Sequence, residues 1–539
     1  MNKLSLRGAC RAVFPASAIG AAILSLAAPA LAQTAAPAPG STLREVTVTG
    51  NPLGATDLVT PAASYSGQEL LLRQATTIGE TLVNTPGVSS TYFGPNASRP
   101  VIRGLDGDRI RILGNGGANL DVSGLSYDHA VTADPISIER IEVLRGAGAL
   151  MYGGSAVGGV VNVIDNRIPR EPLFDAKGGV SGKADVGLAT ANRERGGGLL
   201  LETGTDKYAL HVDVFDRRTS DVRVPLGLSC TQSGVTVVRN SICNSAASTN
   251  GGALGGSVFF DHGYLGASVS TYRNNYGTVA EDEADIRMRT DRFALEGEVR
   301  NLGGWLQSIK GQFSHSDYRH TEFDAGAPQT TFKNRGDELR LEARHKTVNT
   351  GLGALDGVLG LQLDTSRFSA DGAEAFAPYS RTRQAALFAY EELGMSWGKL
   401  TFGARVEDVQ VDSQGNPTVP RFAPASRDFR PLSYALGALV DPDKAGLKNW
   451  GGWQATSNLS WTQRAPKDYE LFADGPHGAT GVYEVGNPAF GKEKSVNVDA
   501  GLKWKSGANT FAVSAFVNDF RNYLSLESTG NTRDAGGNG

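Results

Sequence analysis

The chain has 539 residues, with 52 Lys and Arg against 56 Asp and Glu, and it contains 68 glycines. A mild negative charge excludes a protein that binds nucleic acid through a basic surface. Beyond the N-terminal leader, no stretch reaches the roughly 18 consecutive apolar residues that a spanning helix needs, whereas a membrane β-barrel leaves only a weak hydropathy trace. A soluble protein of this length would be expected to have two or more domains.

Residues 1–32 have the pattern of a secretory signal. Three basic residues precede a short apolar run at 19–31, and Ala30-Leu31-Ala32 is a small-residue cleavage site. The mature chain is therefore expected to begin at Gln33. It would then carry 49 basic and 56 acidic residues, a net charge of −7.

A linker rich in Ala and Pro follows the cleavage site, and after it residues 43–50 read LREVTVTG. This short polar strand stands alone before a Pro/Gly break. An isolated strand with free backbone groups is suited to joining the sheet edge of another protein. The alternative is that it forms the first strand of the domain that follows.

Residues 56–167 are expected to form a mixed α/β body. Ser66 and Glu69 have the spacing of a capping box at the start of a helix over 66–75. A second short helix is predicted over 76–87, ending before Pro86. The stretch 121–169 alternates glycine clusters with β-branched residues, which favours a compact body with sharp corners.

From about Lys177 onward the pattern changes to strands of about ten residues, with apolar side chains alternating with polar ones. This alternation is the signature of a membrane barrel, and about fifteen such strands can be counted. Aromatic residues recur near the predicted strand ends, as in the interfacial girdles of barrels. They include Phe259, Phe260, Tyr272, Trp305, Trp397 and Trp461.

Two cysteines remain after processing, Cys230 and Cys243, in a stretch rich in Ser and Asn. A close pair in an exported chain predicts a disulfide that closes a surface loop. The alternative is a thiolate metal site. Zinc sites of that kind use a CxxC spacing or a second pair of cysteines, so the disulfide is favoured.

Enzymatic motifs are poorly represented. Residues 394–398, GMSWG, match GxSxG, but they join two predicted strands, whereas a nucleophile elbow joins a strand to a helix. A hairpin turn is therefore predicted there, and the sequence contains neither HExxH nor GxxxxGK[ST]. We expect no enzyme, no catalytic residue and no catalytic cofactor.

Several segments of the α/β body carry a family resemblance. The resembling segments are residues 78–90, 99–113, 137–145, MYGGSAVGG at 151–159 and VVNVIDN at 160–166. Together and in this order they resemble the plug of TonB-dependent outer-membrane receptors. Within that superfamily SYDHAVTADP, residues 126–135, is most similar to zinc-uptake receptors of the ZnuD type.

The resemblance implies an all-β transmembrane barrel of about 22 strands with an N-terminal α/β plug domain in its lumen. Residues 33–55 would be a linker with the TonB box at 43–50, 56–167 the plug and 168–539 the barrel. Glu45, Val46, Thr47 and Val48 would pair with the inner-membrane-energised protein TonB, and the barrel would contact outer-membrane lipid. Because only about fifteen strands are counted, the barrel is expected to be incomplete at its C-terminus, by roughly 150–200 residues.

The resemblance also implies a metal site. In the zinc receptors an Asp-His pair of the plug meets a Glu and a His of the barrel, which gives Asp128, His129, Glu322 and His477 here. His320, two residues before Glu322 and on the same strand face, is a reserve ligand in case Glu322 points away. Glu322 and His477 are predicted to lie in long loops, at 318–336 and 464–488. Taken alone, a His in a loop is more often simply solvated.

Imidazole nitrogen and carboxylate oxygen are ordinary zinc ligands, and four of them close a tetrahedral capture site. Where related receptors carry a His-rich loop, residues 274–289 have acids at 281–285 and no His. Such acids concentrate cations or form a solvated loop. Zinc uptake is the expected function, with uptake of a siderophore or other metal chelate as the alternative. A passive porin is disfavoured by the plug, and an adhesin or phage-binding role would be an additional activity.

Overall fold

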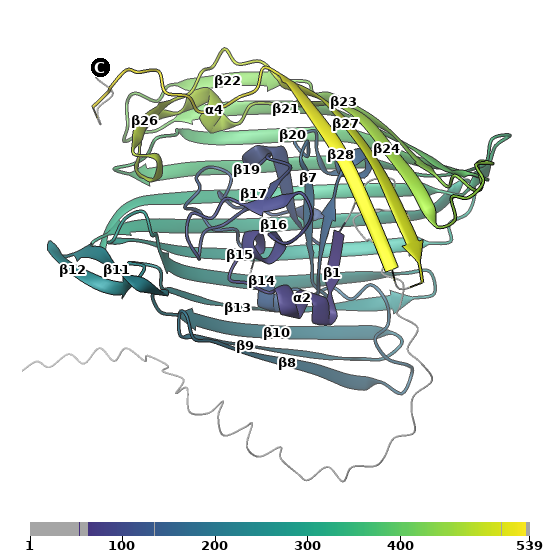
Figure 1. Ribbon diagram of the computed structural model, residues 1–539, viewed down its shortest axis with the longest axis horizontal. Helices are drawn as coiled ribbons and strands as arrows, with labels where there is room; N and C mark the ends of the chain where they lie inside the picture. The colour runs from purple at the N-terminus through teal and green to yellow at the C-terminus, as the bar shows by residue number, and fades with distance from the viewer. Residues whose placement is uncertain (1–52, 54–62, 134, 508, 535–539) are drawn as a thin grey trace, which may run out of the picture. The chain divides into compact units, whose positions relative to one another are not determined.

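The computed structural model describes Leu53 and residues 63–133, 135–507 and 509–534, all within the unit Thr47–Gly539 (Figure 1). The expected leader at 1–32 lies outside the described residues. So do the TonB box residues Glu45, Val46, Thr47 and Val48 and, apart from Leu53, the rest of the linker.

Two short helices, α2 (Gly67–Arg73) and α3 (Ile78–Leu82), follow the first strand of the described chain. α3 is capped by Thr77, whose hydroxyl accepts a hydrogen bond from the backbone N–H of Glu80 at 3.3 Å. The helix ends at Leu82, three residues short of the end predicted before Pro86.

The capping box predicted at Ser66 is wrong. Ser66 does precede α2, but its side chain makes no cap hydrogen bond. Ser66 is also the last residue of strand β1 (Ala63–Ser66), where it pairs with Arg140, so its backbone follows the sheet. Glu69 forms an ion pair with Arg73 one turn later, at 3.3 Å.

The plug is a mixed α/β body, as the sequence predicted. Its sheet has the order β1, β6 (Arg140–Leu144), β7 (Gly159–Ile164), β4 (Ile110–Gly114) and β5 (Gly117–Ala118), with β4 and β7 parallel. The remaining elements are β2 (Val88–Ser90), β3 (Pro100–Ile102) and the 3-10 helices η1 (Gly107–Arg109), η2 (Pro135–Ser137) and η3 (Gly146–Tyr152). Ile78 and Leu82 of α3 pack with Ile141 and Val161 of the sheet in one apolar core.

A large antiparallel sheet surrounds the plug (Figure 1). Its strands are β8 (Gly179–Ala189), β9 (Glu194–Gly204), β10 (Tyr208–Thr219), β13 (Ala247–Phe260), β14 (Gly263–Gly277), β15 (Ala284–Arg300), β16 (Leu306–Asp324), β17 (Ala327–His345), β18 (Val348–Asn349), β19 (Ala354–Gly372), β20 (Tyr379–Met395), β21 (Gly398–Gly415), β22 (Pro424–Phe429), β23 (Leu432–Val440), β24 (Trp453–Arg464), β27 (Glu493–Ser506) and β28 (Asn509–Arg521).

These seventeen strands of the described chain make fifteen spans, because β17 and β18 both pair with β19, and β22 and β23 both pair with β21. Fifteen is the number counted from the sequence. The strands follow one another in the order of a closed barrel, but within the described chain no residue register joins β28 to β8. The sequence count predicted a last strand without a partner. Both β8 and β28 are exposed along most of their length on both faces.

The strands are longer than the ten residues predicted, and β16, β17 and β19 have 19 residues each. About 9–11 residues of a tilted strand cross a bilayer, so these hairpins continue well beyond it. The predicted long loop at 318–336 is therefore wrong. Only Ala325 and Gly326 separate β16 from β17, and both have positive φ, 47° and 80°, as a tight hairpin turn requires.

Side chains alternate along the strands as a membrane barrel requires. In β10, Leu210, Val212 and Val214 are exposed on the outer face, whereas His211 and Asp213 are buried inside. Residues 394–398 form the predicted hairpin turn, with Met395 of β20 paired to Gly398 of β21. Among the described residues, no helix combines the length and apolarity needed to cross a bilayer.

Charged hydrogen bonds tie the plug to the barrel wall. Arg109 of η1 donates two hydrogen bonds to Glu493 of β27, at 3.0 and 2.6 Å. Arg340 and Arg405 each donate to the backbone carbonyl of Met151 in η3, at 2.8 and 3.0 Å. The plug is thus held by β17, β21 and β27 of the barrel wall.

Candidate metal centre

One plug loop brings Asp128 and His129 against the barrel wall. Tyr276 of β14 fixes this loop, because its hydroxyl donates to the carbonyl of Asp128 at 2.8 Å and accepts from the N–H of Ala130 at 2.9 Å. His129 is fully buried, and its Nδ1 lies 3.1 Å from the carbonyl oxygen of Val122. That contact orients the ring and leaves Nε2 directed at the barrel.

Strand β16 supplies His320 and Glu322. His320 is fully buried, with Nδ1 hydrogen-bonded to the Tyr318 hydroxyl at 2.7 Å. Glu322 lies at a β-bulge: it pairs with Ile286 on β15, but on the other side the ladder passes from Thr321 directly to Phe323. Bulges redirect side chains and are frequent beside functional sites.

Three potential ligands meet at this point. His129 Nε2 lies 3.1 Å and His320 Nε2 3.6 Å from Glu322 Oε1. One ligand atom from each of the three residues lies within 4.8 Å of the others. His320 Nε2 is buried without a hydrogen-bond partner in the described part of the chain. Two imidazoles and a carboxylate are a donor set that suits Zn²⁺ and other divalent transition metals.

Asp128 lies at the edge of this group. Its Oδ1 is 3.9 Å from His129 Nε2 and accepts a hydrogen bond from the Ser126 hydroxyl. Burial alone would lower the pKa of His129, but the carboxylates of Asp128 and Glu322 raise it to about 9. Without a metal, His129 is therefore protonated at neutral pH, and an ion that binds there must displace that proton.

The structure does not bring His477 into the group. Residues 464–488, predicted to be a loop, contain α4 (Asp468–Phe472) and a hairpin of β25 (Asp474–His477) and β26 (Val482–Val485), joined through η4 (Gly478–Thr480). His477 Nδ1 lies 2.7 Å from Glu484 Oε1, and its ring stacks on Phe376 at 4.1 Å. His320, which was held in reserve for Glu322, joins Glu322 and His129 in the group.

Sequence reasoning missed Met288, which is buried on β15 directly opposite His320. It also missed Phe332 of β17, whose ring stacks on His320 at a centroid distance of 4.7 Å. The position of the turn between β15 and β16 sets the register of that hairpin. This turn includes NLGG at 301–304 and is recognisable in the sequence, and counting back from it along both strands would have placed Met288 opposite His320.

A plug held inside an antiparallel barrel, with a potential metal centre between the two, defines a class of plugged outer-membrane receptor. Residues 206–538 match the family model "TonB dependent receptor-like, beta-barrel", and residues 55–160 match "TonB-dependent Receptor Plug Domain". The chain belongs to the TonB-dependent receptor family.

Two curated relatives are vitamin B12 transporters named BtuB. The protein from Photobacterium profundum is 30% identical over 163 residues, and the one from Vibrio vulnificus is 26% identical over 169. Each match covers 30% of this chain but only 26% and 27% of the relative. The similarity thus spans about a quarter of the length of these curated relatives.

Solved structures share the fold at low sequence identity. The copper transporter OprC has a TM-score of 0.69 at 17% identity, with 85% of this chain and 70% of that chain covered. The ferric citrate transporter FecA has a TM-score of 0.65 at 16% identity, with 88% and 71% covered. These likenesses show the fold alone.

Proposed function

We propose that this chain is a TonB-dependent transporter that takes up a zinc ion across the bacterial outer membrane. The observation that carries the proposal is the group formed by His129, His320 and Glu322, in which a plug ligand faces two barrel ligands. Asp128, 3.9 Å from His129, is in reach to complete the set. Three or four nitrogen and oxygen ligands without a dedicated water position suit capture of an ion.

The dimensions of the site favour a bare ion over a chelate. Both imidazoles have no exposed surface, and pockets for organic ligands have volumes of roughly 300–1,000 Å³. The alternative, uptake of a siderophore or other metal chelate, is supported by relatives named as transporters of vitamin B12 and ferric citrate.

A second candidate cargo is copper. Met288 is buried opposite His320 in the β15–β16 ladder, so a thioether belongs to the surroundings of the two imidazoles. Thioether sulfur selects Cu(I) over Zn²⁺. A structural neighbour is named as a copper transporter, which agrees with this candidate.

The proposal includes TonB as the partner that supplies energy, through residues 43–50, and the outer membrane as the location. Exposed Leu210, Val212 and Val214 on the outer face of β10 are of the kind that contacts lipid.

Equilibrium titration of the purified receptor with Zn²⁺, Cu²⁺ and, under reductant, Cu⁺ tests the cargo. We expect tight binding of one Zn²⁺ per chain and its loss in His129→Ala. Zinc affinity equal in wild type and His129→Ala would contradict the proposal and favour a chelate. Tighter binding of Cu⁺ than of Zn²⁺ would favour copper.

A further inference from the structure

A disulfide-bridged hairpin protrudes from one end of the barrel, near the ends of β13, β14 and β15 (Figure 1). It consists of β11 (Arg223–Gln232) and β12 (Val235–Ser241), and Cys230 is bonded to Cys243 just beyond β12. Both cysteines are buried. Because their sulfurs are bonded to each other, neither is a thiolate that could bind a metal, which was the alternative for this pair. The bridge therefore fixes the hairpin to the segment that follows it.

That segment is tied to both the wall and the plug. The backbone N–H groups of Ser245 and Ala246 donate to one carboxylate oxygen of Asp221, at 2.9 and 3.1 Å. The Asn96 side chain of the plug donates to the carbonyl of Ser245 at 2.9 Å. The base of the hairpin is thus a fixed point between barrel and plug.

Asn244 connects this fixed point to the acidic loop 278–283, which joins β14 to β15. Its side-chain amide donates to the carbonyls of Thr278, Glu281 and Ala284, at 3.1, 2.8 and 2.6 Å. A Cβ atom at Gly277 would collide with the Asn244 side chain, so glycine there makes room for this contact. Asn244 itself has a φ of 55°, a conformation that Asn tolerates better than most residues.

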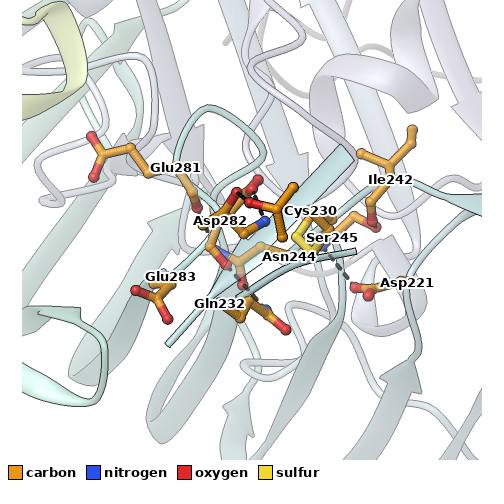
Figure 2. The surroundings of a disulfide bond; sticks show 12 residues. Asp221, Cys230, Gln232, Ile242, Asn244, Ser245, Glu281, Asp282 and Glu283 are labelled. Atoms are coloured by element: carbon orange, nitrogen blue, oxygen red, sulfur yellow. Dashed lines mark hydrogen bonds between the residues drawn. A yellow bond between two sulfur atoms is a disulfide. The ribbon is translucent and has the colours of Figure 1, made fainter. Parts of the chain in front are cut away.

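The tip of the hairpin occupies two of the acids in this loop (Figure 2). Thr231 N–H donates to the Asp282 carboxylate at 2.5 Å, and Ser233 N–H donates to the Glu283 carboxylate. Gln232 also donates to the carbonyl of Asp282, at 3.1 Å. Asp282 and Glu283 are therefore used to hold the loop against the hairpin.

Glu281 differs from its neighbours. Its carboxylate has no hydrogen-bond or ion-pair partner within the described ranges, and Figure 2 shows it directed away from the disulfide. The loop follows directly on the end of the β15–β16 hairpin that carries Glu322. At this end Ala284 pairs with Asp324 and Ile286 with Glu322. Glu281 is an exposed residue, and partial desolvation together with the nearby carboxylates of Asp128, Asp324 and Glu322 raises its pKa.

The plug side of the loop is also in contact. A Cβ atom at Gly94 of the plug would come within 3.0 Å of Val279, so the loop packs closely on the plug backbone. His320 Nε2, buried and without a hydrogen-bond partner among the described residues, marks the ligand position below it. The Glu281 carboxylate therefore lies on a loop next to the metal centre, near enough to Asp128 and Glu322 to interact with them electrostatically.

We propose that Glu281 is the entry carboxylate of the metal centre, which binds the incoming divalent cation before His129, His320 and Glu322 receive it, and that Asn244 and the bridged hairpin position it there. This inference rests on the proposed metal uptake and assigns a role to a loop that has no histidine. Glu281 contacts the cation, and Asn244 is a positioning residue. A carboxylate that binds first accelerates capture, whereas the buried ligands set the rate of release.

Asp285 provides the matched control. The substitution Asp285→Asn removes the same charge from the same acidic stretch as Glu281→Gln. Asp285, however, lies on β15 and forms an ion pair with Arg287 at 2.9 Å. General attraction of cations by the acidic stretch would be reduced in both Glu281→Gln and Asp285→Asn. An entry ligand would be lost only in Glu281→Gln.

The test is stopped-flow binding of Zn²⁺ to the purified full receptor, with association and dissociation rates measured separately. We expect Glu281→Gln to lower the association rate roughly tenfold and to leave dissociation within a factor of about two. Asn244→Ala should give the same loss, and adding it to Glu281→Gln should reduce the rate no further, because both act on one carboxylate. Asp285→Asn should bind at the wild-type rate.

The outcomes separate this inference from the proposed function. Fast binding by wild type and by Glu281→Gln alike would overturn the inference and leave metal uptake intact. Equal losses in Glu281→Gln and Asp285→Asn, or additive losses for Asn244→Ala and Glu281→Gln, would also overturn it. Failure of the wild-type receptor to bind Zn²⁺ would overturn the proposed function, and the entry role with it.

Discussion

The imidazole of His129 lies 3.1 Å from the carboxylate of Glu322, although 193 positions separate them in the chain. One belongs to a plug loop and the other to a bulge in barrel strand β16. This contact, with His320 beside it, exists only while the plug occupies its place in the barrel. The site is therefore a property of the assembled receptor and of neither part alone.

Loss of a buried imidazole should abolish tight zinc binding. We expect His320→Ala to weaken affinity by about 100-fold or more, since removal of residues that only support metal ligands already costs 10–100-fold. His315→Ala is the matched control, because His315 lies on the same strand, is half-exposed and pairs with Asp337 at 2.7 Å. Isothermal titration of both variants measures the difference, and equal affinities would argue against His320 as a ligand.

Met288 distinguishes zinc from copper. Met288→Leu conserves volume and removes only the sulfur, so Zn²⁺ affinity should stay within a factor of about two. If copper is the cargo, Cu⁺ affinity should fall at least about tenfold in the same variant. Competition against a chromophoric chelator under reductant reports both values. A loss of zinc affinity in Met288→Leu would indicate that packing around His320 controls the site.

The Cys230–Cys243 bridge should be found in the exported protein as a linked peptide by mass spectrometry without reductant. Its removal in a Cys230→Ala/Cys243→Ala variant should leave the barrel stable, because the strands are held by their ladder. Proteolysis within 223–246 should become faster, since a loop closure of this size contributes roughly 3 kcal/mol of local constraint. Free thiols on both cysteines of the wild type would refute the pairing.

Asp108 of η1 should give the contact between plug and α4 a distinctive acid dependence. Burial would raise its pKa, but Lys467, Arg464 and Tyr469 lower it to about 2. Because the pKa is lowered in the folded state, the ionised carboxylate stabilises this contact fully above about pH 4. The stabilisation is lost as the pH falls through about 2.

Hydrogen exchange of residues 467–473 measures this effect. Asp108→Asn should open the segment more easily than wild type above pH 4, and the two should converge near pH 2. Asp106→Asn is the control, because the Asp106 carboxylate, on the same plug segment, accepts an exposed hydrogen bond from Tyr127 at 3.1 Å. A difference between wild type and Asp108→Asn that persists unchanged at pH 2 would contradict the assignment.

Deletion of residues 43–50 should abolish zinc uptake by energised cells without changing zinc binding by the purified receptor. The deleted segment is the proposed site of TonB pairing and contains none of the candidate ligands. Uptake of radioactive zinc by cells that carry the deletion measures the first quantity. Uptake at the wild-type rate would show that transport is passive.

The alternation of β10 and the glycine-rich plug segments could be interpreted from the sequence, because periodicity and turn composition are local properties. Fifteen spans were countable for the same reason. The 19-residue length of β16 could not be predicted from the sequence, because the polar residues beyond the bilayer continue the same alternation and resemble a loop. Ser66 was assigned to a helix cap because its pairing with Arg140 is not local.

The candidate site divides in the same way. Asp128, His129 and Glu322 were recognisable as residue types in a resembling pattern. The exchange of His477 for His320 was not, because it depends on a small hairpin that pairs His477 with Val482 and places Glu484 at its imidazole. The bulge at Glu322 depends on the register of three strands, which a single sequence does not reveal.

The divided ligand set has a mechanical consequence. An ion held by His129 on one side and by His320 and Glu322 on the other is a bridge between plug and wall. Any pull that displaces the plug must stretch and break that bridge, so the loaded receptor resists force more than the empty one. Reciprocally, withdrawal of His129 leaves the ion with an incomplete set of ligands, and it is released at the moment a path opens. Cargo release and plug movement would then be one event, driven by the same work.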